Sequence, residues 1–595
     1  MKKILLVALV MLLSVSFSFG RSVVPSDTGI MLAMKDELKR NMEKISIEKL
    51  QKPCYISYSI ADTRIVFIRA RYGSLVQVMD EPMRTQDVRV VVGNYNLNNE
   101  HYLDFNTLWS STSYETAPIE NNYNALRISL WADTDKKFKR AAESYESKVS
   151  AIQQQKLNEA LPADFSTITP VKLALPRAAD SFQRKEWEKT IKDISALFTS
   201  YSAIQDAEAQ LHFYTAMMYF TDAEGSVVSY PFTIVALQVW AKMQAEDGEP
   251  LFDHCVYYVP SLNDLPPIKT IKEEVAAMAR RLTELAKAPV FNEAYSGPVL
   301  FEGQAAAELI AQKFFADENG LCTRRKPVIA SEDVLGYIQY QLENPLEARL
   351  DKKVISRSLS LTASPLLKTY EGTPLLGSLP VDMEGSVPPE TLPLIENGVL
   401  KNMLNGRSPT QRVTGSNGHM HLAMEYNFSK SDIGPSVVMF DGTDKTDMPT
   451  LKRKLIDAGK EEGLDYVYII RKLENASMLM SDQEAKSKKS ASRILAIYRV
   501  RVADGSEQLM RTAELEGMSL KAFKRVIAVS DKKFAYNTML QKTTRQYYGK
   551  ETLNGIPSSF IVPTGILFEE IDLQQEKRSI TPKLPVVPNP ISSNK

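Results

Sequence analysis

The sequence predicts an α+β protein in which N-terminal α/β domains with an antiparallel sheet precede a large, β-rich C-terminal domain. The first observation is a change of period: apolar residues have helical spacing over residues 27–52 and alternate with polar ones over residues 54–92. The second is that helical stretches lie on both sides of two strand-like segments in residues 121–290. The third is a series of short strand-like segments in residues 291–574.

Length limits the number of domains, and charge limits the classes of partner. The 595 residues are enough for about three domains of ordinary size. The formal net charge is zero, so no overall basic field would attract nucleic acid, and we expect no nucleic-acid partner. We predict a signal peptide (1–20), an N-terminal α+β domain (21–120), a middle α+β domain (121–290), a β-rich C-terminal domain (291–574) and a flexible Pro-rich tail (575–595).

The first 20 residues have the pattern of a signal peptide. Lys2 and Lys3 precede an apolar run over residues 4–13, and small residues follow up to Gly20. The alternative is a buried N-terminal helix, but the segment shows no amphipathic period. The run is too short to span a bilayer comfortably. We therefore expect export to a periplasm-like compartment, cleavage near Gly20 and no integral membrane segment afterwards.

The next part of the chain predicts one helix and a meander of strands. An apolar stripe indicates a helix over residues 27–52, which Pro53 ends. Gly73 and residues 80–82 are typical of turns. The alternating pattern therefore predicts four strands, at residues 55–60, 64–71, 75–79 and 88–92.

Residues 121–290 predict helices around an antiparallel strand pair. Thr134 is expected to cap a charged helix over residues 135–157. Gly225 lies in a predicted tight turn at residues 222–226, between the two strands. The predicted helices are residues 123–157, 181–199 and 271–288, and the predicted strands are residues 212–221 and 227–238.

Strands predominate in the C-terminal domain. Asn397-Gly398 between apolar runs is a strong signal for a two-residue hairpin. We predict strands at residues 353–359, 392–395, 399–403, 437–440, 466–471, 494–501, 509–514 and 560–568, and helices at residues 448–463 and 519–526.

One junction in this domain has the features of a functional site. Residues 299–301 predict a short buried strand, and the Ala-rich run over residues 304–316 predicts a helix. Gly303 lies between them, where the backbone needs freedom. A helix that starts at a strand end offers free N–H groups, so such junctions are common places for chemistry.

The junction resembles the one that carries His-Glu-x-x-x-His in the TldD/PmbA family of zinc peptidases, once described as modulators of DNA gyrase. In the catalytic members the two histidines bind zinc and the glutamate is the general base. Laid on that motif, Phe301 and Ala306 stand at the histidine positions and Glu302 stands at the glutamate position. Residues 382–385 and 395–398 are similar to the family's Asp-x-Glu-Gly and Ile-Glu-Asn-Gly segments.

This resemblance implies a non-catalytic protein, similar to the PmbA (TldE-like) half of the family. The catalytic members take a third zinc ligand from a cysteine near the C-terminus, whereas no cysteine follows Cys322 here. Glu302 would then be only the remnant of the general base. Zinc would belong to a partner, which we expect to be a TldD-like catalytic homologue, with a homodimer as the alternative.

We expect the substrate to be a peptide, which this chain would bind by adding it to a sheet edge. Candidate contacts are Glu302, Glu308, Asn417 and Gly418, and the last two lie in a segment similar to the Gly-rich lining of the family's cleft. The ordinary structural interpretation is that Glu302 stabilises the helix start and that Glu308 lies on an exposed helix face.

A pair of histidines offers a different chemistry. His419 and His421 would share one face of a strand and could reach one ion, with Glu425 as a third ligand. The protein would then be an active metallopeptidase with unconventional ligands. The ordinary interpretation is a hydrogen-bonded pair at a strand end. A third hypothesis is a self-associating envelope protein without peptide chemistry.

The cysteines set a limit on disulfides. Cys54, Cys255 and Cys322 allow at most one disulfide, even in an oxidising compartment. The sequence does not decide between one disulfide and three buried, inert thiols.

Overall fold

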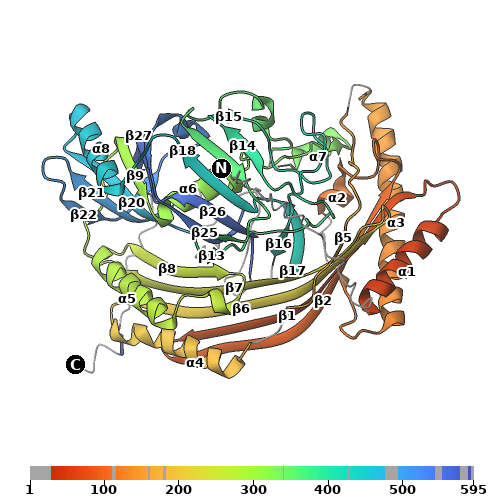
Figure 1. The fold of residues 1–595 in the computed structure, drawn as a ribbon, viewed down its shortest axis with the longest axis horizontal. Coiled ribbons are helices and arrows are strands. Elements are labelled where there is room, and N and C mark those ends of the chain that lie inside the picture. The colour runs from red at the N-terminus through yellow and green to blue at the C-terminus, as the bar shows by residue number, and fades with distance from the viewer. Residues whose placement is uncertain are drawn as a thin grey trace, which may run out of the picture.

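A computed structural model of the protein describes residues 29–109, 115–157, 161–178, 182–338, 341–425, 428–475, 493–542, 553–576, 587, 589 and 590. The predicted signal peptide lies outside the described residues, and so does most of the predicted tail. Within the described residues the α+β class is confirmed: an antiparallel sheet with helices precedes a β-rich C-terminal domain (Figure 1).

The N-terminal half is built on one long curved sheet that lies beneath the C-terminal domain in Figure 1. Its described strands run in the order β4-β2-β1-β6-β7-β5, and β8 also pairs with β7. They are β1 (Pro53–Arg71), β2 (Ser74–Val92), β4 (Glu115–Thr116), β5 (Lys172–Ala174), β6 (Asp206–Asp222), β7 (Val227–Gln244) and β8 (Pro250–Val259). Strands from both predicted N-terminal domains therefore lie in the same sheet.

The four strands predicted in residues 55–92 are two long ones, so that prediction is wrong. Tyr72 and Gly73, with φ of 46° and 83°, form the tight turn between β1 and β2. No turn forms at residues 80–82, because these residues pair with β1 in unbroken register. Asp80 also accepts two hydrogen bonds of 2.9 Å from Arg64 on β1. Pro82 is tolerated in β2 because this part of the strand pairs only with β1.

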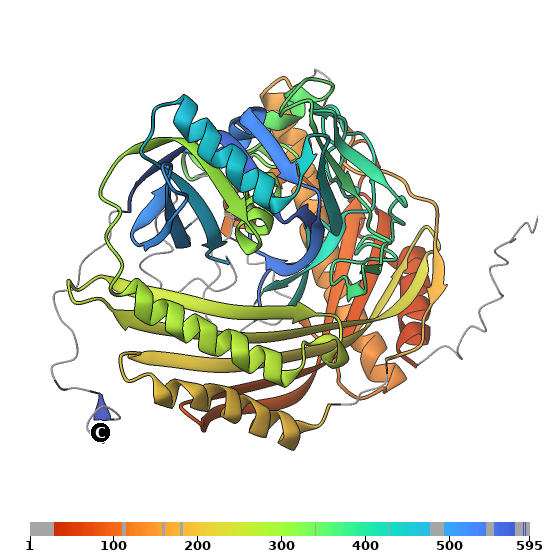
Figure 2. The same cartoon turned by 60° about the vertical axis from the view of Figure 1, so that its left-hand side comes forward.

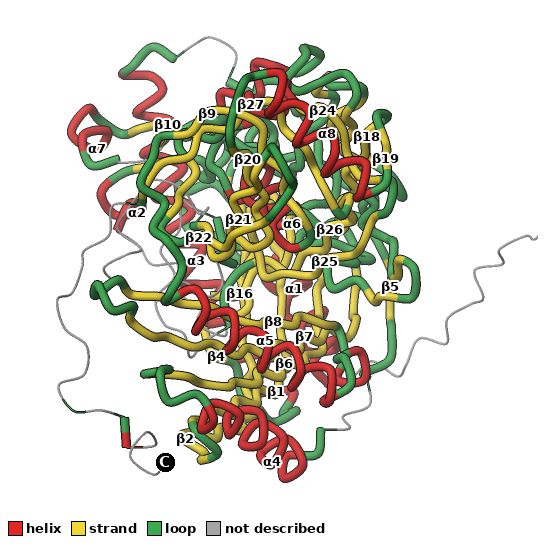
Figure 3. Tube along the Cα trace, turned by 90° about the vertical axis from the view of Figure 1, so that its left-hand side faces the viewer, coloured by secondary structure: helices red, strands yellow, loops and turns green. Residues whose placement is uncertain are grey.

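Helices cover one face of this sheet, and the C-terminal domain covers the other. The helices are α1 (Gly29–Lys44), α3 (Tyr123–Gln154), α4 (Arg184–Ser195) and α5 (Ile268–Leu285). Alternate residues of β6 divide accordingly: Leu211 and Phe213 pack with α4 and α5, whereas Tyr214 packs toward the C-terminal domain. Figures 2 and 3 show α4 and α5 along the sheet, with the C-terminal domain above it.

Thr134 does not begin a helix, which corrects the predicted cap. The helix α3 starts earlier, where the Asn122 side chain accepts a hydrogen bond of 3.0 Å from the Ala125 N–H. Thr134 is buried in the middle of α3 and bonds to Tyr58 of β1 at 2.8 Å. In the sequence Thr134 resembles a helix cap, but in the structure its side chain joins α3 to β1 of the sheet.

The C-terminal domain consists of two larger sheets around a buried helix. One sheet runs in the order β19-β24-β27-β9-β20-β21-β22, with β23 paired to β27, and the other runs in the order β15-β14-β11-β18-β26-β25. The strands are β9 (Tyr295–Glu302), β11 (Leu359–Ala363), β14 (Leu392–Glu396), β15 (Val399–Leu400), β18 (Val437–Gly442), β19 (Lys445–Thr446), β20 (Tyr466–Leu473), β21 (Ile494–Arg501), β22 (Glu507–Met510), β23 (Ala513–Leu515), β24 (Val526–Ser530), β25 (Lys533–Leu540), β26 (Ile556–Pro563) and β27 (Gly565–Gln575).

Smaller elements complete the described chain. They are β3 (Tyr102–Leu103), β10 (Val328–Ile329), β12 (Thr369–Tyr370), β13 (Thr373–Pro374), β16 (Met420–Glu425) and β17 (Phe428–Ile433), with the helices α2 (Phe105–Trp109), α6 (Gln304–Ala311), α7 (Glu332–Gly336) and α8 (Met448–Glu461). Short 3-10 helices occur at Ala196–Ser200, Leu262–Asp264, Pro345–Arg349 and Leu520–Arg525, and a π-helix, η3, occupies Gln312–Ala316. None of the described helices is long and apolar enough to cross a membrane.

Four predicted strands of this domain are wrong in detail. The strand predicted over residues 399–403 is only the two-residue strand β15 (Val399–Leu400). Residues 353–358 form no strand, because β11 begins only at Leu359. The predicted strand over residues 560–568 is β26 and β27, which break at Thr564 and belong to different sheets. The predicted strand over residues 509–514 is also two strands, because Thr512 has a φ of 67°. The predicted helix over residues 519–526 is a 3-10 helix.

A buried arginine ties the two halves of the molecule together. Arg407 has no exposed surface, and its Nη2 lies 2.8 Å from Oε1 of Glu224, in the turn between β6 and β7. Its Nε donates to the Ser166 carbonyl at 2.8 Å, and its guanidinium lies 3.9 Å from the centre of the Phe165 ring. A charge this deeply buried is stable only when it is paired and hydrogen-bonded, so these contacts fix how the halves meet.

Candidate functional site

The predicted strand-to-helix junction is confirmed. The strand β9 ends at Glu302 in the middle of its sheet, between parallel β20 and antiparallel β27. Gly303 makes the turn with a φ of 58°, and its N–H donates to the Thr564 carbonyl at 2.8 Å. The helix α6 and then η3 continue into the space between the two sheets, where their residues are buried. A helix buried on all sides needs the apolar composition seen here.

The two positions that correspond to metal ligands are filled with hydrocarbon. Phe301 and Ala306 have no exposed surface and belong to the central core of the C-terminal domain. The Phe301 ring meets the Phe568 ring edge-on, with centres 5.4 Å apart. Neither side chain has an atom that can donate electrons to an ion, so the residues at this junction do not fit zinc.

Glu302 points away from that core. Its neighbour Leu300 packs with α8 on the outer side of the sheet, and Glu302 lies on the same side because strand residues alternate. Arg471 Nε donates to Glu302 Oε2 at 2.8 Å, and Arg471 also pairs with Glu507 at 2.8 Å. The Glu302 side chain remains 27% exposed. It is therefore a surface carboxylate neutralised by a guanidinium.

Glu308 is buried, which corrects the expected exposed helix face. It is 2% exposed, because α6 runs through the interior of the domain. Its Oε1 accepts hydrogen bonds from Tyr536 Oη at 2.5 Å and Asn475 Nδ2 at 2.8 Å, and its Oε2 accepts one from Gln312 Nε2 at 2.7 Å. Burial raises the pKa of Glu308 to about 7, although these hydrogen bonds oppose the rise.

Glu308 belongs to a polar stripe that the sequence reasoning missed. Gln304, Glu308 and Gln312 are spaced four residues apart and bind the segment 473–475. Gln304 exchanges two hydrogen bonds with the Leu473 backbone, at 2.9 and 3.0 Å, and Gln312 Nε2 donates to the Glu474 carbonyl at 3.0 Å. The regular spacing of these polar residues in an Ala-rich helix is the sequence pattern that could have indicated the stripe.

The histidine pair lies at the start of β16. The Nδ1 atom of His419 is 2.8 Å from the Asn417 carbonyl, and burial lowers the pKa of His419 to about 4. In the described part of the chain neither ring nitrogen of His421 has a hydrogen-bond partner, and burial lowers its pKa to about 3. Both rings are therefore neutral at pH 7. The side chain of Glu425 lies outside the described part.

Asn417 and Gly418 shape the loop before these histidines. Asn417 Oδ1 accepts a hydrogen bond from the Asn405 N–H, and its Nδ2 donates to the Met403 carbonyl, both at 2.8 Å. Gly418 has a φ of 74°, and a Cβ atom there would lie 2.5 Å from Pro388 Cα.

In the described chain, no group of three His, Cys, Asp or Glu side chains could hold a metal ion.

The three cysteines, all in the described residues, are free thiols. Burial raises the pKa of Cys54 and of Cys255 to about 11, and it also raises the pKa of Cys322. Such thiols are protonated at neutral pH and therefore weak nucleophiles.

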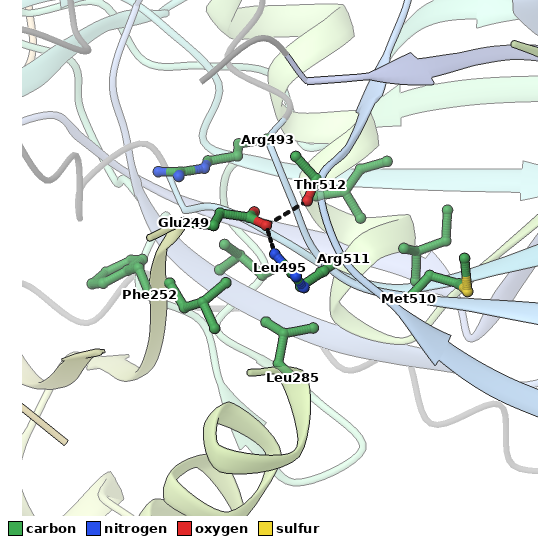
Figure 4. A pocket seen from close by; sticks show the side chains of 11 residues that line it. Glu249, Phe252, Leu285, Arg493, Leu495, Met510, Arg511 and Thr512 are labelled. Carbon is green, nitrogen blue, oxygen red and sulfur yellow. Dashed lines mark hydrogen bonds and ion pairs between the residues drawn. The ribbon is translucent and has the colours of Figure 1, made fainter. Parts of the chain in front are cut away.

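A small pocket lies where the N-terminal sheet meets the C-terminal domain (Figure 4). Aliphatic and aromatic side chains line most of it, and Glu249 pairs there with Arg511 and accepts a hydrogen bond of 2.6 Å from Thr512 Oγ1. None of the predicted site residues lines this pocket. Its polar groups join the turn before β8 to the segment between β22 and β23.

Comparison with known proteins agrees with this architecture. Residues 295–575 match the family model of the PmbA/TldA metallopeptidase C-terminal domain. No curated protein sequence matches the chain.

Three solved structures are similar over most of the chain. One is a candidate modulator of DNA gyrase from Thermotoga maritima (TM-score 0.54, 15% identity, covering 87% of this chain and 96% of that one). Another is TldE from Thermococcus kodakarensis (TM-score 0.51, 12% identity, 91% and 100%). A third is a candidate modulator of DNA gyrase from Bacteroides thetaiotaomicron (TM-score 0.52, 12% identity, 92% and 98%). At such low identity these likenesses show the fold alone.

Proposed function

Because the chain belongs to the TldD/PmbA family, we propose that it is a non-catalytic, peptide-binding subunit that acts beside a zinc-bearing homologue in peptide processing. The observation that carries the proposal is the burial of Phe301 and Ala306 in the apolar core. Zinc-dependent hydrolysis needs three protein ligands and an open position for water. Two of the three expected ligand positions hold hydrocarbon side chains, and no cysteine follows Cys322 to supply the third.

The pairing of Glu302 supports the same proposal. A general base must reach a water molecule, and its carboxylate must be free to accept a proton. The Glu302 carboxylate is held by Arg471 on the outer side of the sheet, opposite to the face of Phe301. Its side chain also stays partly exposed, so a peptide amine could compete there with the guanidinium.

The zinc-bearing partner would supply the chemistry, and this chain would complete the peptide-binding surface. An extended peptide is bound most simply by hydrogen bonds to an open sheet edge. In the described strand order, β22 lies at one end of its sheet in the C-terminal domain, opposite β19, and β25 lies at one end of the other sheet, opposite β15. These edges are where we propose that the peptide adds.

Metal analysis combined with co-purification tests the proposal. The chain is recovered from the native envelope fraction, and zinc is measured in the complex and in the isolated chain. We expect a His-Glu-x-x-x-His homologue to co-purify and to account for the zinc. Stoichiometric zinc in the isolated chain would overturn the proposal.

A matched pair of variants locates the catalytic base. In the reconstituted complex, Glu302→Gln is expected to leave peptide hydrolysis within a few-fold of the parent rate. The same change at the glutamate of the partner's motif should abolish it. The reverse result would assign the base to this chain.

Two observations favour the histidine alternative. Both imidazoles are neutral at pH 7, and in the described residues the two ring nitrogens of His421 have no hydrogen-bond partner. An active metallopeptidase of this kind would lose activity both with a chelator and with His421→Ala. Activity that survives the substitution would remove this pair from consideration. Failure to recover any homologue would instead favour a self-associating envelope protein.

A further inference from the structure

We infer that the protonation state of Glu308 controls how firmly the segment 472–475 is held against the central helix α6. Through this segment it also controls how firmly the strand β8 of the N-terminal sheet is held there. This inference does not depend on the proposed function. It rests on where the carboxyl group lies, on what it binds and on the lack of a compensating charge around it.

The first step is the position of the carboxyl group between three elements. Its hydrogen bonds come from Gln312 on η3, Tyr536 on β25 and Asn475 just beyond β20. Asn475 Nδ2 also lies 3.1 Å from Tyr536 Oη and 3.1 Å from Thr538 Oγ1. One carboxyl group thus joins the helix to both of the sheets that enclose it.

The second step is the continuation of this network into the other half of the molecule. The Asn475 N–H donates to Nε2 of His254, a buried residue of β8, at 3.2 Å. Lys472, three residues earlier, lies 2.6 Å from Asp253 of the same strand, and Asp253 also pairs with Arg281. The segment 472–475 is therefore fixed to α6 on one side and to β8 on the other.

The third step is the charge environment. In the described residues Glu308 makes no ion pair, and its hydrogen-bond donors are neutral. The cationic groups on the elements around it are engaged elsewhere: Lys313 of η3 interacts with Asp317, Lys472 of β20 pairs with Asp253, and Lys533 of β25 pairs with Asp441. The nearby carboxylates are Glu302 of β9, which pairs with Arg471, and Glu474, a buried residue next to Asn475. Burial keeps His254 neutral, and β26 has no titratable side chain.

An ionised Glu308 would consequently be a buried charge without a counter-charge, which low-polarity surroundings disfavour. A protonated carboxyl can instead donate to Tyr536 Oη, because the phenol hydroxyl can rotate. Burial raises the pKa of Glu308 from 4.5 to about 7, in agreement with this view. The folded state therefore holds the proton more tightly than the unfolded state does. The resulting stability is fully present below the unfolded pKa and is lost as the pH rises through the folded one.

The experiment compares the full-length protein with Glu308→Gln, a neutral variant of the same shape, in chemical unfolding between pH 5.5 and pH 8.5. We expect the unfolding equilibrium constant of the parent to rise over this range by about 30-fold relative to the variant, as the shift of this one group requires. Hydrogen exchange corrected for intrinsic rates should show faster opening of residues 472–475 and of β8 at high pH in the parent only. Glu302→Gln is the control and should keep the pH profile of the parent.

Identical pH profiles for the parent and Glu308→Gln would overturn the inference. If Glu308→Gln does not fold, Tyr536→Phe provides the second measurement. It removes one donor from the ionised carboxylate, so the midpoint of the pH-dependent loss should move upward. A midpoint that does not move would also overturn the inference.

Discussion

At the scale of single residues, the alternation of side chains along β9 places Phe301 and Glu302 on opposite faces of the sheet. Phe301 faces the core and Glu302 faces the outer side, where Arg471 neutralises it. The sequence showed that metal-ligating side chains are missing, but it could not show which way Glu302 points or what binds it. Arg471 is distant in sequence, and pairing between β9 and β20 brings it close.

Replacing Phe301 with alanine should destabilise the protein by about 3–5 kcal/mol, because a fully buried aromatic side chain is lost from the core. Equilibrium unfolding in urea measures the change. Glu302→Ala is the matched control, and its cost should stay below about 1 kcal/mol, as is usual for a surface ion pair. Equal costs for the two variants would contradict the assignment of faces.

Alanine substitutions at two glycines close together in the sequence test whether the loop before the histidines needs its observed conformation. Gly418→Ala should cost about 1–3 kcal/mol, because φ is positive and the new methyl would meet the Pro388 backbone. Gly415→Ala is the control, since nothing lies within 4 Å of the position of its Cβ. The shift of the urea midpoint measures both. A neutral Gly418→Ala would show that the loop does not need this conformation.

At the scale of elements, the periodicity of the sequence predicted most of the regular structure. The helix α5 and the strands β6 and β7 occur where their patterns indicated, joined by the expected turn at residues 222–226. The failures have local causes. Pro82 resembles a turn residue but lies in a strand that pairs on one side there, and Thr512 breaks a strand through a positive φ that threonine rarely adopts.

The start of α3 gives a test at this scale. Asn122→Ala should cost about 1 kcal/mol, because the first turn loses its side-chain acceptor. Asn122→Ser keeps an acceptor and should retain most of the stability. Thermal unfolding followed by circular dichroism distinguishes them. No effect of Asn122→Ala would mean that the helix does not depend on this cap.

Buried polar groups were the hardest features to predict. Glu308 looked like a residue of an exposed helix face, because a lone glutamate in an Ala-rich helix is usually solvated. Its partners Asn475 and Tyr536 lie more than 160 residues away in sequence. A single sequence without structure gives no means of bringing such distant residues together.

At the scale of the whole molecule, we propose that the protein is exported. Mass spectrometry of the protein from the native envelope fraction should find an N-terminus near Arg21, since cleavage is expected near Gly20. A protein that keeps Lys2 and Lys3 in a cytoplasmic fraction would contradict export. Substitution of Leu5 and Leu6 by charged residues should retain the full-length chain in the cytoplasm.

The pairing of β9 with β27 also constrains how the chain is made. Glu302 pairs with Gly565 and Val299 pairs with Phe568, so a strand at the centre of its sheet meets a neighbour that leaves the ribosome more than 260 residues later. The C-terminal domain therefore cannot close during synthesis. The sheet of a nascent chain is therefore still incomplete when β27 is made, and an open chain is the form that a secretion channel for unfolded polypeptides accepts.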